Sequence, residues 1–124
     1  MSAVKFDIIE HPQYVEFITA GDPTEKQWIE LLHRIVEELE RSGKSRVFVD
    51  ASNMTTIPDS MVRYRMGIRT GETLSVSARI AVFYPLLKDD NFWETVATNR
   101  GALARSGNDR DELLAWLLQD DDRS

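Results

Sequence analysis

Hydrophobic and polar residues alternate over residues 4–9, which read VKFDII. A period of two is typical of a half-exposed β-strand, so a strand is expected there. Residues 11–13 contain a histidine and a proline and are expected to turn, and residues 14–19 are expected to form a second strand. Because the connection is so short, the pattern predicts an antiparallel hairpin.

A helical period follows the break at residues 20–21. Asp22 is the expected N-cap, Pro23 suits the first helical position, and Glu25 suits the first turn. Gly43 is expected to end this helix in a left-handed conformation. The apolar stripe expected to face a sheet comprises Trp28, Leu31, Leu32, Ile35, Val36 and Leu39. Two pairs are expected on the polar side, Glu30–Arg34 and Glu37–Arg41.

Two short apolar runs, residues 46–50 and 79–84, are typical of strands covered on both faces. The remaining pattern predicts a loop over 51–57, helices over 58–72, 89–99 and 109–119, and an edge strand over 101–105. In the second helix Met61, Val62, Met66 and Ile68 are available for burial, and Gly67 weakens the helix by roughly 1 kcal/mol relative to alanine. The order β-β-α-β-α-β-α-(β)-α predicts an α/β fold with a mixed sheet, an antiparallel N-terminal hairpin and parallel inner strands. We expect one domain over 1–119 and a charged tail over 120–124.

Composition narrows the function classes. The 124 residues carry a formal net charge of -6, which argues against a nucleic-acid partner because phosphate binding needs a basic surface. The chain has no cysteine, so disulfides and thiolate chemistry are excluded. No signal peptide is evident, and no apolar run approaches the roughly 20 residues of a membrane span. We therefore expect a cytoplasmic protein.

The order of elements, the strands RVFVD at 46–50 and RIAVF at 79–83, and the final segment DELLAWL at 111–117 resemble the SpoIIAA-like family of the STAS superfamily. The resemblance covers nearly the whole chain and implies a β-α superhelix, which is shared with the CRAL-TRIO lipid-binding domains. It also implies a non-enzymatic regulatory or protein-interaction module, since the best known relatives are anti-sigma-factor antagonists.

The regulatory members carry an acid and a phosphorylatable serine where the helix after the central strand begins. Asp59 and Ser60 match that acid and serine, but Pro58 is an added residue and the following small residue and glycine are replaced by Met61 and Val62. This departure predicts that Ser60 is not an efficient phosphorylation switch.

No set of residues in the sequence predicts catalysis. His11 is expected in a turn and His33 at the edge of a buried stripe, and neither has a partner at metal-ligand spacing. The pair 89–90 is more readily explained as an acidic helix start than as a cation site. We expect no enzymatic activity, no cofactor and no metal.

Two surfaces remain as candidates. The first is a protein-docking surface on the second helix and the loop before it, comprising Asn53, Asp59, Ser60, Arg63, Arg65 and Arg69. Arginines on this helix are complementary to an acidic partner, and Arg65 and Arg69 share a face while Arg63 points elsewhere. The alternative is a solvated helix surface whose arginines pair with acids such as Asp59 and Glu72.

The second candidate is a crevice for a small apolar or lipid-like ligand at the carboxyl edge of the sheet, where open α/β sheets place ligands. Its expected lining is Asp50, Ser52, Asn53, Tyr84, Leu86, Leu87, Phe92 and Trp93. Aromatic side chains would supply bulk there, and a few polar groups would orient the ligand. The alternatives are ordinary packing of the loop onto the sheet or a homodimer contact.

Overall fold

A mixed five-stranded sheet carries the fold in the computed structural model, which describes residues 5–74, 78–88 and 90–119. The elements are β1 (Lys5–Glu10), β2 (Val15–Gly21), α1 (Glu25–Ser42), β3 (Arg46–Met54), α2 (Ser60–Leu74), β4 (Arg79–Phe83), the 3₁₀ turn η2 (Pro85–Leu87), α3 (Phe92–Asn99), β5 (Leu103–Gly107) and α4 (Arg110–Leu117). The expected tail at 120–124 lies outside the described residues.

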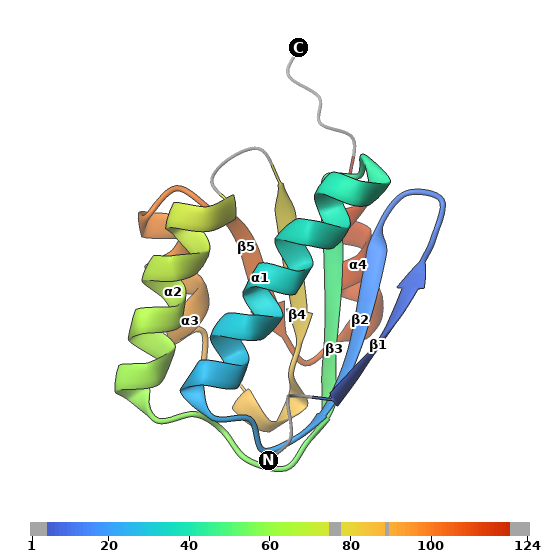
Figure 1. The fold of residues 1–124 in the computed structure, drawn as a ribbon. Coiled ribbons are helices and arrows are strands. Elements are labelled where there is room, and N and C mark those ends of the chain that lie inside the picture. The colour runs from blue at the N-terminus through green and yellow to red at the C-terminus, as the bar shows by residue number, and fades with distance from the viewer. Residues whose placement is uncertain (1–4, 75–77, 89, 120–124) are drawn as a thin grey trace.

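The strands lie side by side in their order along the chain (Figure 1). β1 pairs with β2 in antiparallel fashion, and the pairs β2–β3, β3–β4 and β4–β5 are parallel. The predicted α/β fold with a mixed sheet is therefore confirmed. Helices α1, α2 and α3 cover one face of the sheet, and α4 lies on the other.

Two apolar layers result from this arrangement. The larger lies between the sheet and α1–α3 and includes Val15, Phe17, Leu31, Leu32, Ile35, Val47, Val49, Met66 and Ile80. The smaller joins α4 to the opposite face through Phe48, Ala81, Leu113 and Leu117. Residues 47–49 are buried as expected, whereas the second predicted core strand is buried at Ile80 and Ala81 and only half-buried at Val82 and Phe83.

The first helix begins two residues later than the sequence suggested. Thr24, not Asp22, is the N-cap: its hydroxyl accepts a hydrogen bond from the Gln27 backbone N–H, and the Gln27 side chain accepts one from the Thr24 backbone N–H. This reciprocal capping box satisfies two end groups at once, which Asp22 on the far side of Pro23 does not do. The helix ends at Gly43, whose φ of 74° is the expected left-handed conformation.

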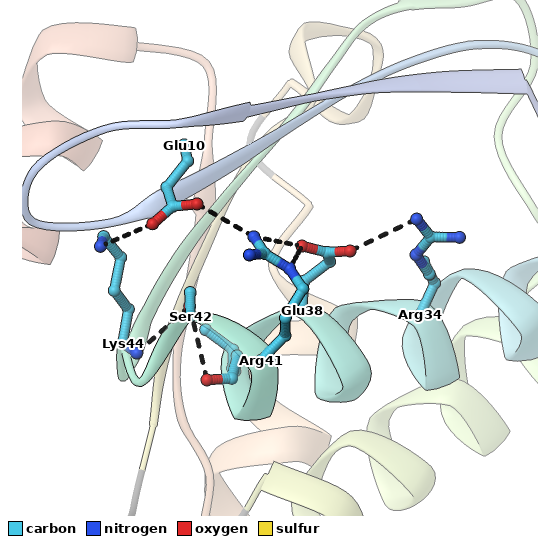
Figure 2. Close-up of polar contacts among 7 residues, drawn as sticks. Glu10, Arg34, Glu38, Arg41, Ser42 and Lys44 are labelled. Carbon is cyan, nitrogen blue, oxygen red and sulfur yellow. Dashed lines mark hydrogen bonds and ion pairs between the residues drawn. The ribbon is translucent and has the colours of Figure 1, made fainter.

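The expected pairs Glu30–Arg34 and Glu37–Arg41 are replaced by an ion cluster around Glu38 and Glu10 (Figure 2). Glu38 is buried on α1. Its carboxylate accepts hydrogen bonds from the Arg34 guanidinium at 3.3 Å and from the Arg41 guanidinium at 2.9 Å. Arg41 also reaches Glu10 on β1 at 2.9 Å, and Lys44 reaches the same carboxylate at 3.0 Å. Hydrogen bonds from Arg41 and Lys44 lower the pKa of Glu10. The cluster ties the hairpin to the end of α1.

Several predicted boundaries shift. The central strand continues through residues 51–54, which were expected to be loop, because β2 offers pairing partners as far as Gly21. α3 starts at Phe92 rather than residue 89, after η2 occupies the preceding segment, and β5 lies two residues later than expected. Met61, one of the residues available for burial, is instead 56% exposed in the first turn of α2.

Glycines set the distance between α2 and α3. A Cβ on Gly67 would lie 2.7 Å from the Val96 side chain, and one on Gly71 would lie 2.3 Å from the Arg100 Cβ and 2.9 Å from the Arg100 carbonyl oxygen. Two glycines four residues apart share one face of a helix, so that face approaches its neighbour closely. Each glycine weakens α2 relative to alanine, but a side chain at either position would prevent this close packing of α2 against α3. No helix in the described ranges is long and apolar enough to span a bilayer.

Candidate functional site

An apolar cavity of about 80 Å³ lies beneath the three helices that cover the front of the sheet. Its walls come from α1, α2, α3, the inner strands and the segment after β4. The lining residues are Trp28, Leu31, Leu32, Ile35, Val49, Pro58, Arg63, Met66, Thr70, Ile80, Val82, Tyr84, Leu87, Trp93 and Ser106. Ligand-binding pockets share this mostly apolar lining, although they are commonly several-fold larger, about 300–1,000 Å³.

Two residues of this lining each have a buried polar atom without a hydrogen-bond partner: the indole Nε1 of Trp28 and the guanidinium Nε of Arg63. Within the described part of the chain, these are the buried side-chain nitrogen and oxygen atoms that lack a partner. An unsatisfied buried donor costs roughly 1–3 kcal/mol, so natural structures seldom retain one without a reason. Both atoms belong to residues that line the same cavity, although they come from different helices.

The other polar groups of the lining are already engaged. The Thr70 hydroxyl donates to the Met66 carbonyl oxygen at 2.7 Å, and the Tyr84 hydroxyl donates to the carbonyl oxygen of Thr56. Burial raises the pKa of Tyr84 to about 12, and the nearby Asp22 carboxylate contributes to the rise. The phenol therefore stays protonated at physiological pH and serves as a structural donor.

Arg63 connects the cavity to the surface. Its Nη1 donates to the Asp90 carboxylate, and its guanidinium lies over the Phe92 ring, 6.0 Å from the centroid. The Arg63 side chain is 17% exposed and that of Asp90 is 40% exposed, so the ion pair lies at the rim. A hydrogen bond from the Phe92 backbone N–H, followed by one from Arg63, lowers the pKa of Asp90. The inner Nε of Arg63 remains unpaired while its outer end is held.

Only some of the residues predicted to line the crevice lie at the cavity. Tyr84, Leu87 and Trp93 line the cavity, whereas Leu86 and Phe92 are about 40% exposed on the outside. The sequence did not identify Trp28 as a site residue, and it placed Arg63 on the docking surface rather than at a cavity. Trp28 was assigned to the packing stripe of α1; the one signal that sets Arg63 apart is its position on a different face from Arg65 and Arg69.

Asp50 and Ser52 lie away from the cavity. Val49 lines the cavity, and successive residues of a strand point to opposite faces. Asp50 accepts from the Ser52 hydroxyl at 2.6 Å and from Arg110 of α4 at 3.2 Å, on the side that α4 covers. Asn53 is exposed near the end of β3.

A buried carboxylate anchors the same polar network behind the sheet. Glu16 is 4% exposed and contacts Arg110 Nη2 at 2.9 Å and His11 Nε2 at 2.9 Å. The Arg110 guanidinium also lies over the Phe48 ring, 4.7 Å from its centroid. His11 therefore has a partner that its turn position did not reveal. Because the Glu16 carboxylate has a hydrogen-bond partner on each side, the network joins β2 to the start of α4.

The predicted docking surface is exposed over most of its residues. Asp59 caps α2 by accepting from the Val62 backbone N–H, and Ser60, the first residue of the helix, is exposed. Arg65 forms a bidentate pair with Glu25 of α1, at 2.7 and 2.8 Å, rather than with Asp59 or Glu72. Hydrogen bonds from Arg65 lower the pKa of Glu25.

Apolar side chains gather around this surface. Seven large hydrophobic side chains are exposed in the described residues. Five of them come from the loop before α2, the first turns of α2, η2 and the start of α3: Ile57, Met61, Tyr64, Leu86 and Phe92. Tyr64 and Phe92 stack with ring centroids 6.4 Å apart, which joins the α2 and α3 contributions. We call these five residues the apolar rim. Clustered exposed apolar groups are more informative than scattered ones.

Among the described residues, no group of three or more histidine and carboxylate side chains is arranged to hold a metal ion. No protein-family model and no curated protein matches the sequence. One solved structure that resembles this chain is an uncharacterised protein of the DUF3478 family from Shewanella loihica PV-4, described as having a SpoIIAA-like fold. The two are 16% identical, the match covers 93% of each chain, and the TM-score is 0.48.

Proposed function

We propose that this domain binds a small, largely apolar molecule in the cavity beneath α1, α2 and α3. The observation that carries the proposal is the cavity itself, an almost wholly apolar space walled by side chains of three helices and the sheet. Burial of apolar ligand surface against such walls supplies affinity. An apolar cavity of roughly 150 Å³ holds a benzene molecule, so about 80 Å³ suits a smaller or partly inserted group.

The site is proposed to bind rather than to catalyse. The Tyr84 hydroxyl and the Thr70 hydroxyl, which would otherwise be candidate reactive groups, are committed to backbone carbonyl oxygens. A catalytic site needs a nucleophile or base in contact with a second group that activates it. The arrangement around the cavity supports recognition by shape and by apolar contact.

Native mass spectrometry of freshly purified protein and thermal unfolding with added probes test the proposal together. Isobutanol, benzene and 3-methylbutanoate are suitable probes. A ligand at one hundred times its dissociation constant stabilises by about 2.7 kcal/mol, which a melting curve resolves. We expect at least one probe to raise the melting temperature. Val82→Phe, which fills the cavity, should abolish the rise, and Leu114→Phe on α4 should retain it. Ligand binding would be refuted if native mass spectrometry finds only the mass of the polypeptide and none of the three probes changes the melting temperature.

A second function is favoured by the apolar rim beside the arginines of α2: a regulatory module that docks a partner protein. The partner would present acidic groups next to an apolar surface, matching Arg69 and Arg65 beside Met61 and Tyr64. Methionine adapts to varied partner surfaces, and its exposure on α2 supports such a role. The prediction that Ser60 is not an efficient phosphorylation switch stays a prediction within this proposal.

Charge reversal tests the docking surface. Arg65→Glu with Arg69→Glu should change the melting temperature little, because an exposed pair such as Arg65–Glu25 contributes about 0–1 kcal/mol. It should abolish capture of a partner from extract of the native cell. Arg46→Glu with Arg105→Glu makes an equal charge change near α4 and should leave capture intact. Capture by a folded Arg65, Arg69 double variant would eliminate this surface.

A further inference from the structure

We infer that the partner of the docking surface is a second copy of this chain, and that the apolar rim is the centre of a two-fold symmetric dimer interface. The inference rests on the proposed docking function and names its partner. Among the described residues, the other two exposed large hydrophobic side chains, Ile9 and Leu103, lie singly on β1 and β5. Scattered apolar residues are normal on a protein surface, whereas clustered ones mark interaction sites.

Direct contacts join the α2 and α3 parts of the rim. Met61 and Tyr64 are three residues apart and share one face of α2. The Tyr64 ring stacks on the Phe92 ring, and the Arg63 guanidinium lies 6.0 Å from the centroid of the Phe92 ring. Arg63 also pairs with Asp90, two residues before Phe92. These contacts hold the start of α3 against the first turns of α2.

A hydrogen bond joins the loop before α2 to η2. The hydroxyl of Tyr84, the residue directly before η2, donates to the carbonyl oxygen of Thr56. Thr56 precedes Ile57, and η2 carries Leu86, so the bond links the two segments that supply these exposed side chains. Because the segments of the rim are already fixed to one another, little backbone freedom is lost when a partner covers them.

The area of the rim fits the apolar part of a dimer interface. An aromatic side chain offers roughly 150–250 Å² when fully accessible, and the five residues are 37–56% exposed. The rim therefore presents on the order of 400 Å² of apolar surface. A standard interface buries about 800 Å² on each partner, of which a little over half is apolar. The rim supplies most of that apolar share, and the polar residues around it complete the interface.

Charges of both signs surround the rim, which suits a second copy better than a uniformly acidic partner. The segments that form the rim carry negative charge at Asp59 and Asp90 and positive charge at Arg63, Arg65 and Lys88. In a two-fold interface the same patch faces itself, so it can supply both members of an opposite-charge pair. A partner with acidic groups alone would meet Asp59 and Asp90 as well as the arginines, and like charges across an interface are unfavourable.

The arginines beside the rim are already paired within one chain. Arg63 Nη1 binds the Asp90 carboxylate, and Arg65 binds Glu25 through two hydrogen bonds. Covering these pairs leaves no charge without a partner, which is the arrangement that makes charge burial strongly unfavourable. The net charge of -6 on each copy opposes association, but salt screens exposed charges beyond about 8–10 Å under physiological conditions.

Sedimentation equilibrium of the full chain tests the inference. Between about 1 μM and about 1 mM we expect the average mass to rise from that of one chain toward that of two. Raising the ionic strength from about 0.05 M to about 0.5 M should strengthen the dimer, because salt screens the repulsion between the copies while the apolar contact remains. A single chain at every concentration overturns the inference, and a dimer that salt dissociates overturns the apolar rim as its centre.

The variant Met61→Glu assigns the dimer to the rim. Met61 is exposed in the first turn of α2, where an acidic side chain is compatible with the helix dipole, so the variant should fold. It places a like charge on both copies and should raise the dimer dissociation constant at least tenfold. Ile9→Glu and Leu103→Glu make the same charge change at the other two exposed hydrophobic positions and should leave the dissociation constant as in the parent. An unaffected Met61→Glu dimer, or an equal loss in either control, overturns the assignment to the rim.

Isotope-filtered NMR of the parent protein needs no variant. When a chain with labelled methionine methyl groups is mixed with an unlabelled chain, the Met61 methyl group should show nuclear Overhauser contacts to the Tyr64 or Phe92 ring of the other copy. Absence of these contacts in a sample that sediments as a dimer overturns the inference.

Failure of the docking function is distinguishable from failure of the dimer. If the chain is a monomer and its capture of another protein is lost with Arg65→Glu and Arg69→Glu, the second-copy inference is overturned and docking stands. If the chain is a monomer and the double variant captures as the parent does, both are overturned.

Discussion

Replacing Gly71 with alanine tests the packing of α2 on α3, because helix propensity and tertiary packing predict opposite signs. In an isolated helix the change would stabilise by about 1 kcal/mol. In this protein the new Cβ would lie 2.3 Å from the Arg100 Cβ and 2.9 Å from the Arg100 carbonyl oxygen. Carbon atoms pack at about 3.5–4.0 Å, so the overlap exceeds an ångström and involves backbone that cannot rotate away.

Relief therefore requires α2 and α3 to separate. Overpacking of this kind costs roughly 1–3 kcal/mol, occasionally more. Subtracting the gain in propensity leaves a net loss between near zero and a few kcal/mol, and the backbone overlap places Gly71→Ala toward the upper end. For a domain of this size, each kcal/mol corresponds to roughly 3–6 °C in melting temperature.

Urea unfolding with linear extrapolation measures the difference directly. Thr73→Ala, on an exposed position of the same helix, is the control and should be neutral or slightly stabilising, since alanine is the better helix former. A Gly71→Ala protein as stable as the Thr73→Ala protein would refute the close approach of the two helices.

Three further changes test the fold and its charges. Ile35→Ala removes a side chain that is 2% exposed and should cost about 2–5 kcal/mol in chemical unfolding; a loss below about 0.5 kcal/mol would contradict its burial. Thr24→Ala removes the observed N-cap and should lower the free energy of unfolding by about 1 kcal/mol, and Asp22→Ala should lower it clearly less. A larger loss for Asp22→Ala than for Thr24→Ala would show that Asp22 is the cap. The pKa of Glu25 is lowered in the folded protein by hydrogen bonds from Arg65, so its contribution to stability is present at neutral pH and is lost as pH falls through the acid range. In the Glu25→Gln variant, the melting temperature should depend less on pH in the acid range. An unchanged pH dependence would show that the Glu25–Arg65 pair contributes nothing to stability.

Local sequence was sufficient for the strands and for α1, because each carries its own periodic pattern. The start of α1 was misplaced because Asp22 and Thr24 are both good caps. The choice between them depends on Gln27, whose side chain completes the capping box with Thr24. The continuation of β3 to Met54 was also missed, because Ser52 and Asn53 are polar and the strand is extended by pairing of Asn53 and Met54 with β2.

The candidate site was harder to predict because it depends on how the sheet is wound. Ligand crevices at the carboxyl edge form where strand order reverses and helices pass to opposite faces. Here strand order follows chain order, and α1, α2 and α3 all cover one face. The cavity therefore lies under the helices, bringing together Trp28 and Arg63, which no local pattern connects. Alternation along β3 sends Asp50 to the opposite face, where Arg110 binds it.

The position of α4 has a consequence for the growing chain. The apolar face formed by Phe48 and Ala81 is covered by Leu113 and Leu117, which are made after all five strands. Until that last helix has left the ribosome, a nascent chain can pair its strands but presents this face to water. Shortened chains that stop before Leu113 should therefore associate with one another or with chaperones, while chains that include Leu117 should not.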